Sequence, residues 1–422
     1  MTSRLLEGVR VVEMCEVWAG PMGGSLLADL GADVIKVESY PRNSMTRPLV
    51  VGPAAPVAGD GPPYEMSAIH HLANRNKRNI ALNGRDERGA EVLSRLIEGA
   101  DLFFESYSAG AVERLGLGPE RVHEINPRCT MISMPGWGVA GPYEGYVTLG
   151  SGLDSTVGHW AIRGYPDLDR DEVTAVFHSD ATGALTLVFA AVAALRRREQ
   201  TGEGSFIDIA QTEAFAWQLP GTYAEYTLNG RVPEPLGNEE PYVAPHNVYR
   251  CAAGLSGEEA WIVLAAENDA QWAALATVAG HDEWAEDGHA WSTVHGRLGA
   301  REEIDAALAD LAAGSVAEEL ADAVQAAGAI GAAVASPIGV LASPQHAARG
   351  WLETVDHPVA GQHQHSGFLW RIAPDAPSWD RYSALVGEHN DEVLTELGYD
   401  GAAREALREA GVIGTAYGTR DG

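Results

Sequence analysis

The sequence predicts an α/β protein built on a parallel sheet. A short β-branched run at residues 9–13 is followed by an apolar stripe with helical spacing and then by a second apolar run at 34–37. This order of strand, helix and strand is typical of parallel sheets, in which the helix crosses one face of the sheet. Strand-like and helical runs alternate again from residue 79 to residue 134, so we expect the sheet to extend beyond the first unit.

The first predicted unit contains a turn that is placed to contact a ligand. Its helix begins near Pro21, which suits a first helical turn, and stops at Gly31, which suits a left-handed helix end. In open parallel sheets, ligands bind at the carboxyl ends of the strands. The turn after the first strand supplies three residues there: Val17, Trp18 and Ala19.

A dinucleotide is one candidate ligand of this turn. Glu38 ends the second predicted strand, where dinucleotide-binding proteins carry an acid that binds ribose. The turn reads WAGPMGG, however, and lacks the spaced glycines of GxGxxG. The sequence therefore does not favour a nicotinamide cofactor.

The tract HHLANRNKRNIALN gathers polar and basic residues before a predicted strand at 79–82. In so acidic a chain, Asn76, Lys77 and Arg78 form a candidate phosphate clamp. A basic loop held by ion pairs is the alternative, and composition alone favours that alternative. A helix at 87–99 and strands at 102–105 and 128–134 continue the α/β pattern.

The stretch VFHSDATG at 176–183 holds one carboxylate, Asp180, at the start of the apolar run 183–195. The run predicts a helix that ends in three consecutive arginines, where cations favour the helix dipole. An acidic side chain just before such a run usually caps the helix by accepting backbone N–H bonds. From local pattern alone, capping is therefore the simplest role for Asp180.

The chain changes character after residue 220. Residues 221–241 contain several prolines, glycines and acids and are expected to form a linker. Strand-like runs at 242–250 and 260–265, followed by helical segments rich in Ala and Trp, predict a smaller α+β domain over 242–330. A later segment places three histidines close together in sequence: His357, His363 and His365. The strand-like alternation around them and the lack of a nearby cysteine argue against a zinc site. No metal site is expected.

Charge and cysteine content limit the ligands and the compartment. The formal net charge is −30, from 59 acidic and 29 basic side chains, so neither nucleic acid nor an anionic membrane is an expected partner. The three cysteines are odd in number and far apart, which predicts free thiols in a reducing compartment. Charges interrupt the apolar residues of the amino terminus, and no run approaches the roughly 18 apolar residues of a membrane span. We therefore expect a cytoplasmic protein.

Several stretches, taken together and in order, resemble the family III CoA-transferases, also called the CaiB/BaiF family. They are LEGVRVVEM with AGP, LADLGADVIKVE, NRNKRNIAL, ERLGLG, SDATG, TGEGSFIDIAQTEA, and DHPVAG with GEHNDEVL. The resemblance extends from about residue 5 to about residue 400. It implies a Rossmann-like large domain formed by both chain ends, 1–220 and 331–422, with the smaller domain inserted between them. It also implies a homodimer of two interlocked chains, with active sites between domains of different subunits.

The resemblance gives Asp180 a chemical role, because it matches the catalytic aspartate of the family. The implied activity moves coenzyme A from an acyl-CoA to a free carboxylic acid through aspartyl anhydride and aspartyl-CoA thioester intermediates. Coenzyme A is then a substrate, and no tightly bound cofactor is expected. Each step passes through an oxyanion that needs backbone N–H donors. The turn after the strand at 128–134 offers candidates for the oxyanion and substrate: Gly136, Trp137 and Gly138.

The family pattern also carries over to residues that would bind coenzyme A. They comprise Val17, Trp18, Ala19, Ser39, Asn76, Lys77, Arg78, Ser106, Tyr107 and Arg114. Two of them depart from the pattern, since Ser39 stands where several members have Arg, and Trp18 where the formyl-CoA enzymes have Gln. The glycine-rich lid of the formyl-CoA enzymes has no counterpart here, so oxalate and formate are not expected substrates.

Two alternatives to a homodimeric transferase stay open. The related α-methylacyl-CoA racemases use a His and an Asp to move an α-proton, but Leu153 stands here where they carry the His before Asp154. His159 and His178 are the possible replacements. The second alternative is that the chain is the active subunit of a heteromeric transferase. The presence of Asp180 argues against a non-catalytic subunit. A bulky apolar acid and a dicarboxylate donor such as succinyl-CoA are both candidate substrates.

Overall fold

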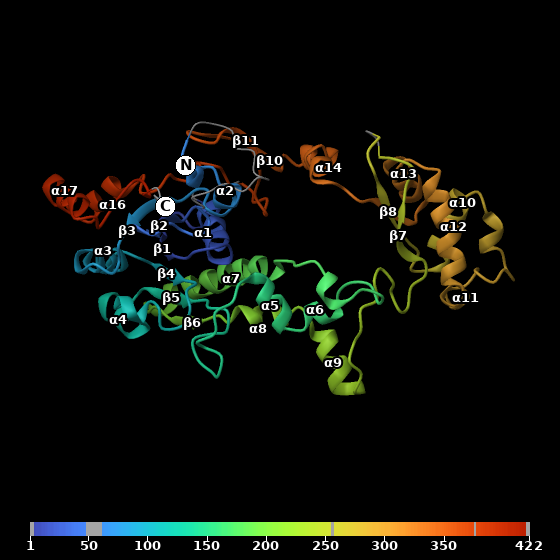
Figure 1. Ribbon diagram of the computed structural model, residues 1–422, viewed down its shortest axis with the longest axis horizontal. Coiled ribbons are helices and arrows are strands. Elements are labelled where there is room, and N and C mark those ends of the chain that lie inside the picture. The colour runs from blue at the N-terminus through green and yellow to red at the C-terminus, as the bar shows by residue number, and fades with distance from the viewer. Residues whose placement is uncertain (1–3, 48–60, 255–256, 375–376, 419–422) are drawn as a thin grey trace. The chain divides into compact units, whose positions relative to one another are not determined.

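The computed structural model describes residues 4–47, 61–254, 257–374 and 377–418 (Figure 1). The chain forms two compact units. The large unit comprises Met1–Trp160, Thr174–Arg231 and Ala347–Gly422, and the small unit comprises Ala161–Val173 and Val232–His346. Both chain ends therefore contribute to the large unit.

The large unit is built on a six-stranded sheet in which every neighbouring pair of strands is parallel. Its strands are β1 (Arg10–Met14), β2 (Asp33–Ser39), β3 (Arg78–Leu82), β4 (Leu102–Glu105), β5 (Thr130–Ser133) and β6 (Phe206–Asp208). The spatial order is β3-β2-β1-β4-β5-β6, which confirms the predicted parallel sheet. The order reverses between β1 and β4, and a crevice is expected at their carboxyl ends.

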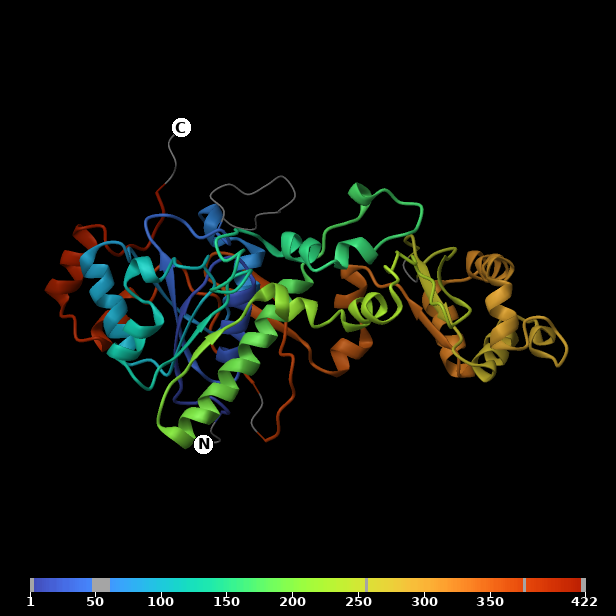
Figure 2. The same ribbon diagram turned by 90° about the horizontal axis from the view of Figure 1, so that it is seen from below.

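Alternate residues of the strands point to opposite faces and belong to two separate cores. Val12 of β1 packs with α3 (Glu87–Glu98), whereas its neighbour Val11 packs with α1 (Ala19–Asp29) and α7 (His178–Thr201). Figure 2 shows α7, in green, on one side of the sheet and the red carboxyl-terminal helices on the other. The remaining elements of the large unit are α2 (Ala68–Ala73), α4 (Pro119–Ile125), α5 (Gly150–Thr156), α8 (Gln211–Ala216), α9 (Pro220–Asn229), β10 (Leu352–His357), β11 (Gly361–Ser366), α16 (Asn390–Glu396) and α17 (Gly401–Glu409).

Helix α7 is longer and more apolar than expected from the sequence pattern. Among the described residues it is the helix whose length and composition would suffice to cross a membrane, with a mean hydropathy of 1.3 over its most apolar window. Half of that window is buried, and the helix packs against α1. The same length and composition are found in core helices of globular proteins, and α7 lies in the core of the large unit.

The small unit consists of an antiparallel sheet and helices around a separate core. Its elements are β7 (His246–Arg250), β8 (Trp261–Ala265), β9 (Ile330–Ala333), α10 (Asp269–Val278), α11 (Val294–Gly299), α12 (Arg301–Ala313), α13 (Ala317–Ala327) and α14 (Pro337–Leu341). Trp272 is fully buried at the centre of this core. Helices α6 (His159–Ile162) and α15 (Pro344–Ala348) lie where the sequence ranges of the two units meet, and 3-10 turns occupy Pro63–Glu65, Glu113–Leu115, Arg170–Glu172 and Asp282–Ala285.

The unit boundaries differ from those expected from the sequence. Strand β9 crosses the expected boundary at 330/331, because its pairing with β8 keeps the following residues with the small unit. The expected linker 221–241 begins within helix α9, which ends only where Gly230 adopts a left-handed conformation. Residues 161–173 also belong to the small unit, which no local pattern indicated.

Candidate active site

Asp180 is the third residue of α7, so its position at a helix start is as expected. Its role there is not that of a cap, since the residue at the N-cap is Phe177 and no side chain caps the helix. Instead the Asp180 carboxylate accepts a hydrogen bond from the backbone N–H of Ala19. Ala19 is the first residue of α1. Two helix starts, which favour negative charge, therefore meet at one carboxylate.

The backbone at Val17 directs this contact. Val17 has φ +65°, in the left-handed region, which is unusual for a β-branched residue and costs on the order of 1–3 kcal/mol. The strained residue turns the chain between β1 and α1, so that the N–H of Ala19 faces α7. The Trp18 ring, 5.9 Å from that of Phe177, packs between the two helix starts.

Asp180 is nearly buried, with 8% of its surface exposed. Burial raises its pKa to about 6, and the Ala19 N–H partly opposes the shift. A methyl group added at Gly150 would lie 2.2 Å from Asp180 Oδ2, so the first residue of α5 must be glycine for the carboxylate to hold its position. The side chain is therefore tightly confined.

A small cavity of about 90 Å³ opens beside Asp180. It lies at the carboxyl ends of β1 and β4, where the strand order reverses, and the expected ligand residues Val17, Trp18 and Ala19 line it. Gln211 also lines it, and its amide donates to the Met134 carbonyl at 2.8 Å. Sequence reasoning missed Gln211, although it stands in the family motif TGEGSFIDIAQTEA.

The three residues after β5 that were expected to bind the oxyanion or substrate do not all lie at the small cavity. Gly136 lines the small cavity, whereas Gly138 faces Asp208, whose carboxylate accepts the neighbouring Val139 N–H at 3.1 Å. The Trp137 ring packs against Tyr146, with ring centroids 6.1 Å apart, and Tyr146 itself lines the cavity. Trp137 and Gly138 therefore support the turn, and Gly136 alone of the three lines the small cavity.

A larger groove of about 930 Å³ shares a wall with the small cavity. It runs along the carboxyl ends of β1 to β4, and five of the expected coenzyme A residues line it: Val17, Ser39, Ser106, Tyr107 and Arg114. Two further arginines, Arg42 and Arg85, line it as well. They stand in loops after β2 and β3 that carry no distinctive basic pattern, so sequence reasoning did not single them out.

The basic tract before β3 does not form a phosphate clamp. The Lys77 ammonium is buried and pairs with Glu13 at 2.7 Å, and burial lowers its pKa to about 8. Arg78 pairs with Asp33 and Glu396, both at 2.6 Å. Both side chains are held in ion pairs within the fold, Lys77 with a buried carboxylate and Arg78 with two partly exposed ones, which corrects the clamp interpretation in favour of its ion-paired alternative.

Asn76 has a similar structural role. Its amide donates to Asp29 at 2.9 Å and to the Ser378 carbonyl at 3.1 Å. The backbone N–H groups of Asp380 and Arg381 donate to its side-chain oxygen. Asn76 therefore joins α1 to the carboxyl-terminal segment and does not line the groove.

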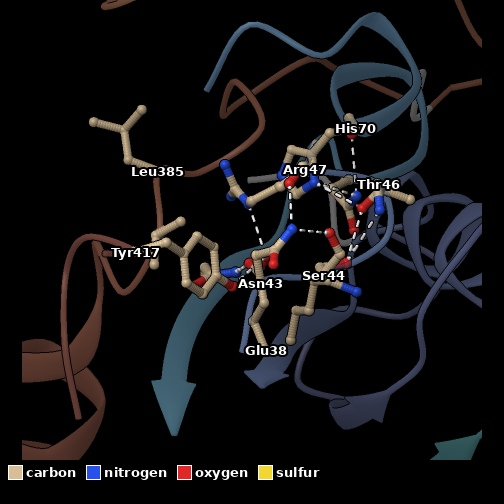
Figure 3. Close-up of polar contacts among 12 residues, drawn as sticks. Glu38, Asn43, Ser44, Thr46, Arg47, His70, Leu385 and Tyr417 are labelled. Atoms are coloured by element: carbon tan, nitrogen blue, oxygen red, sulfur yellow. Dashed lines mark hydrogen bonds and ion pairs between the residues drawn. The ribbon is translucent and has the colours of Figure 1, made fainter. Parts of the chain in front are cut away.

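A buried arginine anchors the loop that forms one side of the groove (Figure 3). Arg47 is fully buried and donates to Glu38 at 2.7 Å, to the Ala384 carbonyl at 2.5 Å and to Glu65. The same loop contributes Arg42 to the groove. Because Glu38 binds Arg47, Asn79 and the Tyr417 hydroxyl, it is not available to a ribose.

The histidines considered as metal ligands pack against one another and against His71. The His71 ring lies edge-on to that of His357, with centroids 4.4 Å apart, and is tilted against that of His363, with centroids 5.6 Å apart. Burial lowers the pKa of His71 to about 3 and that of His365 to about 4. Within the described ranges, no group of three or more His, Cys, Asp or Glu side chains is arranged to hold a metal ion.

Two histidines could replace the one used by racemases, His159 and His178. His178 is exposed at the start of α7 and does not line the small cavity, and His159 pairs elsewhere. His159 Nδ1 contacts Asp154, which is fully buried in α5, and its ring lies 5.3 Å from that of Phe215. Neither residue is among those that line the small cavity. Leu153 lines it instead, so the described wall beside Asp180 carries no second proton-transfer group at that position.

Comparisons with known proteins give a consistent result. The model of CoA-transferase family III matches residues 6–390. The chain is 29% identical to succinyl-CoA--D-citramalate CoA-transferase of Chloroflexus aurantiacus, over 93% of this chain and 94% of the relative. It is 30% identical to formyl-CoA:oxalate CoA-transferase of Streptomyces coelicolor, over 98% of this chain and 100% of the relative. These relatives are named for different acids.

A solved structure has the same fold. The crystal structure of a CaiB/BaiF family protein from Brucella suis superimposes with a TM-score of 0.82 at 29% sequence identity. The match covers 94% of this chain and 100% of the other.

Proposed function

Since this chain belongs to CoA-transferase family III and is an enzyme that transfers coenzyme A between carboxylic acids, we propose that the transfer takes place on Asp180. The observation that carries the proposal is the position of this carboxylate. It is buried at a helix start, beside a cavity that shares a wall with a large groove.

The first half of the reaction loads the enzyme. An Asp180 oxygen attacks the thioester carbonyl of the acyl-CoA, the carbon–sulfur bond breaks, and a mixed anhydride and the CoA thiolate result. The thiolate then attacks the aspartyl carbonyl of the anhydride. The donor acid leaves as a carboxylate, and Asp180 holds coenzyme A as a thioester.

The second half reverses these steps with another acid. The acceptor carboxylate attacks the aspartyl thioester and releases the CoA thiolate, which leaves a second mixed anhydride. The thiolate attacks the acceptor carbonyl of that anhydride, so that the new acyl-CoA forms and Asp180 returns as a carboxylate. No net proton transfer or redox change occurs, and the energy of the thioester is conserved throughout.

Two features near Asp180 suit this chemistry. Its pKa of about 6 leaves most of the carboxyl ionised at neutral pH, so that no general base is needed. Burial removes part of its hydration shell, and the Ala19 N–H is fixed close to the oxygen where charge develops. We assign Ala19, supported by the strained Val17, as an oxyanion donor.

We assign the groove to coenzyme A. Three arginines, Arg42, Arg85 and Arg114, line it and supply the local positive charge that phosphates need in so acidic a protein. Tyr107 lines both the groove and the small cavity, so it lies where the thioester end of the substrate would enter.

We also propose that the enzyme works in the cytoplasm as an interlocked homodimer. Leu185, Phe189 and Val192 form an outward-facing apolar stripe on α7, and Phe189 is 77% exposed. Exposed apolar patches of this kind are typical of protein interfaces. The cytoplasmic location is proposed because the three cysteines are free and buried, which suits a reducing compartment. Light scattering after size-exclusion chromatography would test the homodimer, and a monomeric mass would contradict it.

Trapping of the intermediate tests the catalytic role. After incubation with a panel of acyl-CoAs, hydroxylamine or borohydride should modify Asp180, which peptide mass spectrometry would locate. Asp180→Asn should show neither adduct nor transfer, whereas Asp171→Asn, at an exposed position, should behave as wild type. Active enzyme that never yields the adduct would overturn the mechanism. Entry of solvent deuterium at the α-carbon without acyl exchange would instead favour the racemase reaction.

A further inference from the structure

The small cavity beside Asp180 has an acidic wall. Among its described lining residues, the charged side chains are Asp180 and Glu16, and neither Lys nor Arg is present. Glu16 follows β1 and lines both the cavity and the groove. Its side chain is 12% exposed, so its carboxylate is largely enclosed in the shared wall.

In the described part of the chain, Glu16 has one distant cationic partner, and that partner does not line the cavity. The Ser39 hydroxyl donates to Glu16 Oε1 at 3.1 Å. Arg42 approaches Glu16 Oε2 only to 3.9 Å, its side chain is 72% exposed, and it lines the groove but not the cavity. In the proposed function this arginine faces the phosphates of coenzyme A.

The other walls of the cavity are uncharged. They include Val17, Trp18, Tyr146, Val147, Leu149 and Leu153. An acid whose reacting carboxylate meets Asp180 extends along these side chains. An apolar body binds more favourably there because its surface leaves water. A second carboxylate would lose its hydration and would be repelled by the like charge of Glu16, with no Lys or Arg among the described lining residues to offset the cost.

We propose that Glu16 is a specificity-determining residue that rejects dicarboxylic acids, and that the acids exchanged are monocarboxylic acids with an uncharged body. Discrimination arises from repulsion of the wrong substrate as well as from apolar contact with the right one. The inference rests on the proposed function, since it takes Asp180 as the site of transfer.

Matched pairs of acceptor acids test the inference. Pentanoate and glutarate have the same chain length and differ in one terminal carboxylate, and benzoate and terephthalate form an aromatic pair. For each pair, kcat/KM is measured with wild type and with Glu16→Gln. Wild type should prefer the monocarboxylate by at least about tenfold, and Glu16→Gln should reduce that preference about tenfold, by improving the dicarboxylate.

Two control variants separate specificity from structure. Glu16→Asp keeps the charge and should keep the preference, while Glu98→Gln, at an exposed position on α3, should leave every rate unchanged. If Glu16 merely held the loop through Ser39, Glu16→Gln would alter both acids of a pair equally, and the inference would be wrong. A wild-type preference for glutarate over pentanoate would also overturn it.

Failure of the proposed function gives a different result. In that case Asp180 would yield no trapped adduct and Asp180→Asn would still transfer coenzyme A, so the specificity argument would lose its basis as well. Transfer through Asp180 with a preference for dicarboxylates would overturn the inference and leave the proposed function intact.

Discussion

Replacement of Gly150 by alanine is expected to lower kcat for CoA transfer by about a hundredfold. The added methyl carbon would lie 2.2 Å from Asp180 Oδ2, about 1 Å closer than carbon and oxygen normally approach. Gly150 opens α5 and the contact is with a side chain, so the carboxylate is the group that moves. Displacement of a reacting group by about 1 Å costs roughly a factor of 100 in rate.

The fold itself should tolerate this change. Alanine is favoured over glycine in a helix by about 1 kcal/mol, which offsets part of the steric cost. The assay compares kcat and the yield of the trapped Asp180 adduct with the thermal unfolding midpoint. Gly145→Ala is the matched control, because a methyl carbon there meets nothing within 4 Å.

Wild-type kcat in Gly150→Ala would refute this reasoning, since the carboxylate would then not need the position that it has in the structure. A loss of kcat that merely follows a large fall in the unfolding midpoint would refute it as well, because the effect would lie in the fold.

Three other predictions concern pH, stability and substrate binding. Because burial raises the pKa of Asp180 to about 6, kcat/KM should fall tenfold per pH unit below that value in a pH–rate profile. The same raised pKa means that the free energy of unfolding decreases as pH rises from 3.8 to 6, when the buried carboxyl loses its proton. Asp180→Asn, which carries no charge, should therefore unfold at a higher temperature than wild type at pH 7. Arg47→Met leaves Glu38 and Glu65 buried without their cation and should cost about 3–5 kcal/mol in urea unfolding. Arg114→Ala should raise KM for acyl-CoA about tenfold with kcat unchanged, whereas Arg121→Ala, at an exposed position outside the groove, should change neither constant.

Local sequence pattern determined much of the large unit. The helix expected at 87–99 is α3, Glu87–Glu98, and the strand expected at 102–105 is β4, Leu102–Glu105. Apolar periodicity acts through near neighbours, so a single sequence contains the information needed. The ordered series of motifs also indicated the family, which the comparisons confirm.

Long-range contacts decided which polar residues belong to the site. Lys77 and Arg78 resembled a phosphate clamp because their charge is visible in the sequence, but the carboxylates that bind Arg78 from α16 are 314 and 318 residues away. Conversely, Arg42 and Arg85 stand in undistinguished loops, and only the sheet order brings them into one groove.

For Asp180 and Glu16, too, the sequence determined one part of the site and the tertiary structure another. The sequence placed Asp180 at a helix start, and the resemblance gave it a chemical role. Only the tertiary structure brought the Ala19 N–H and Gly150 against it and placed Glu16 in the wall of the same cavity. The physical reason is that a side chain's hydration and charge partners depend on what packs around it in space, and a sequence records only its neighbours along the chain.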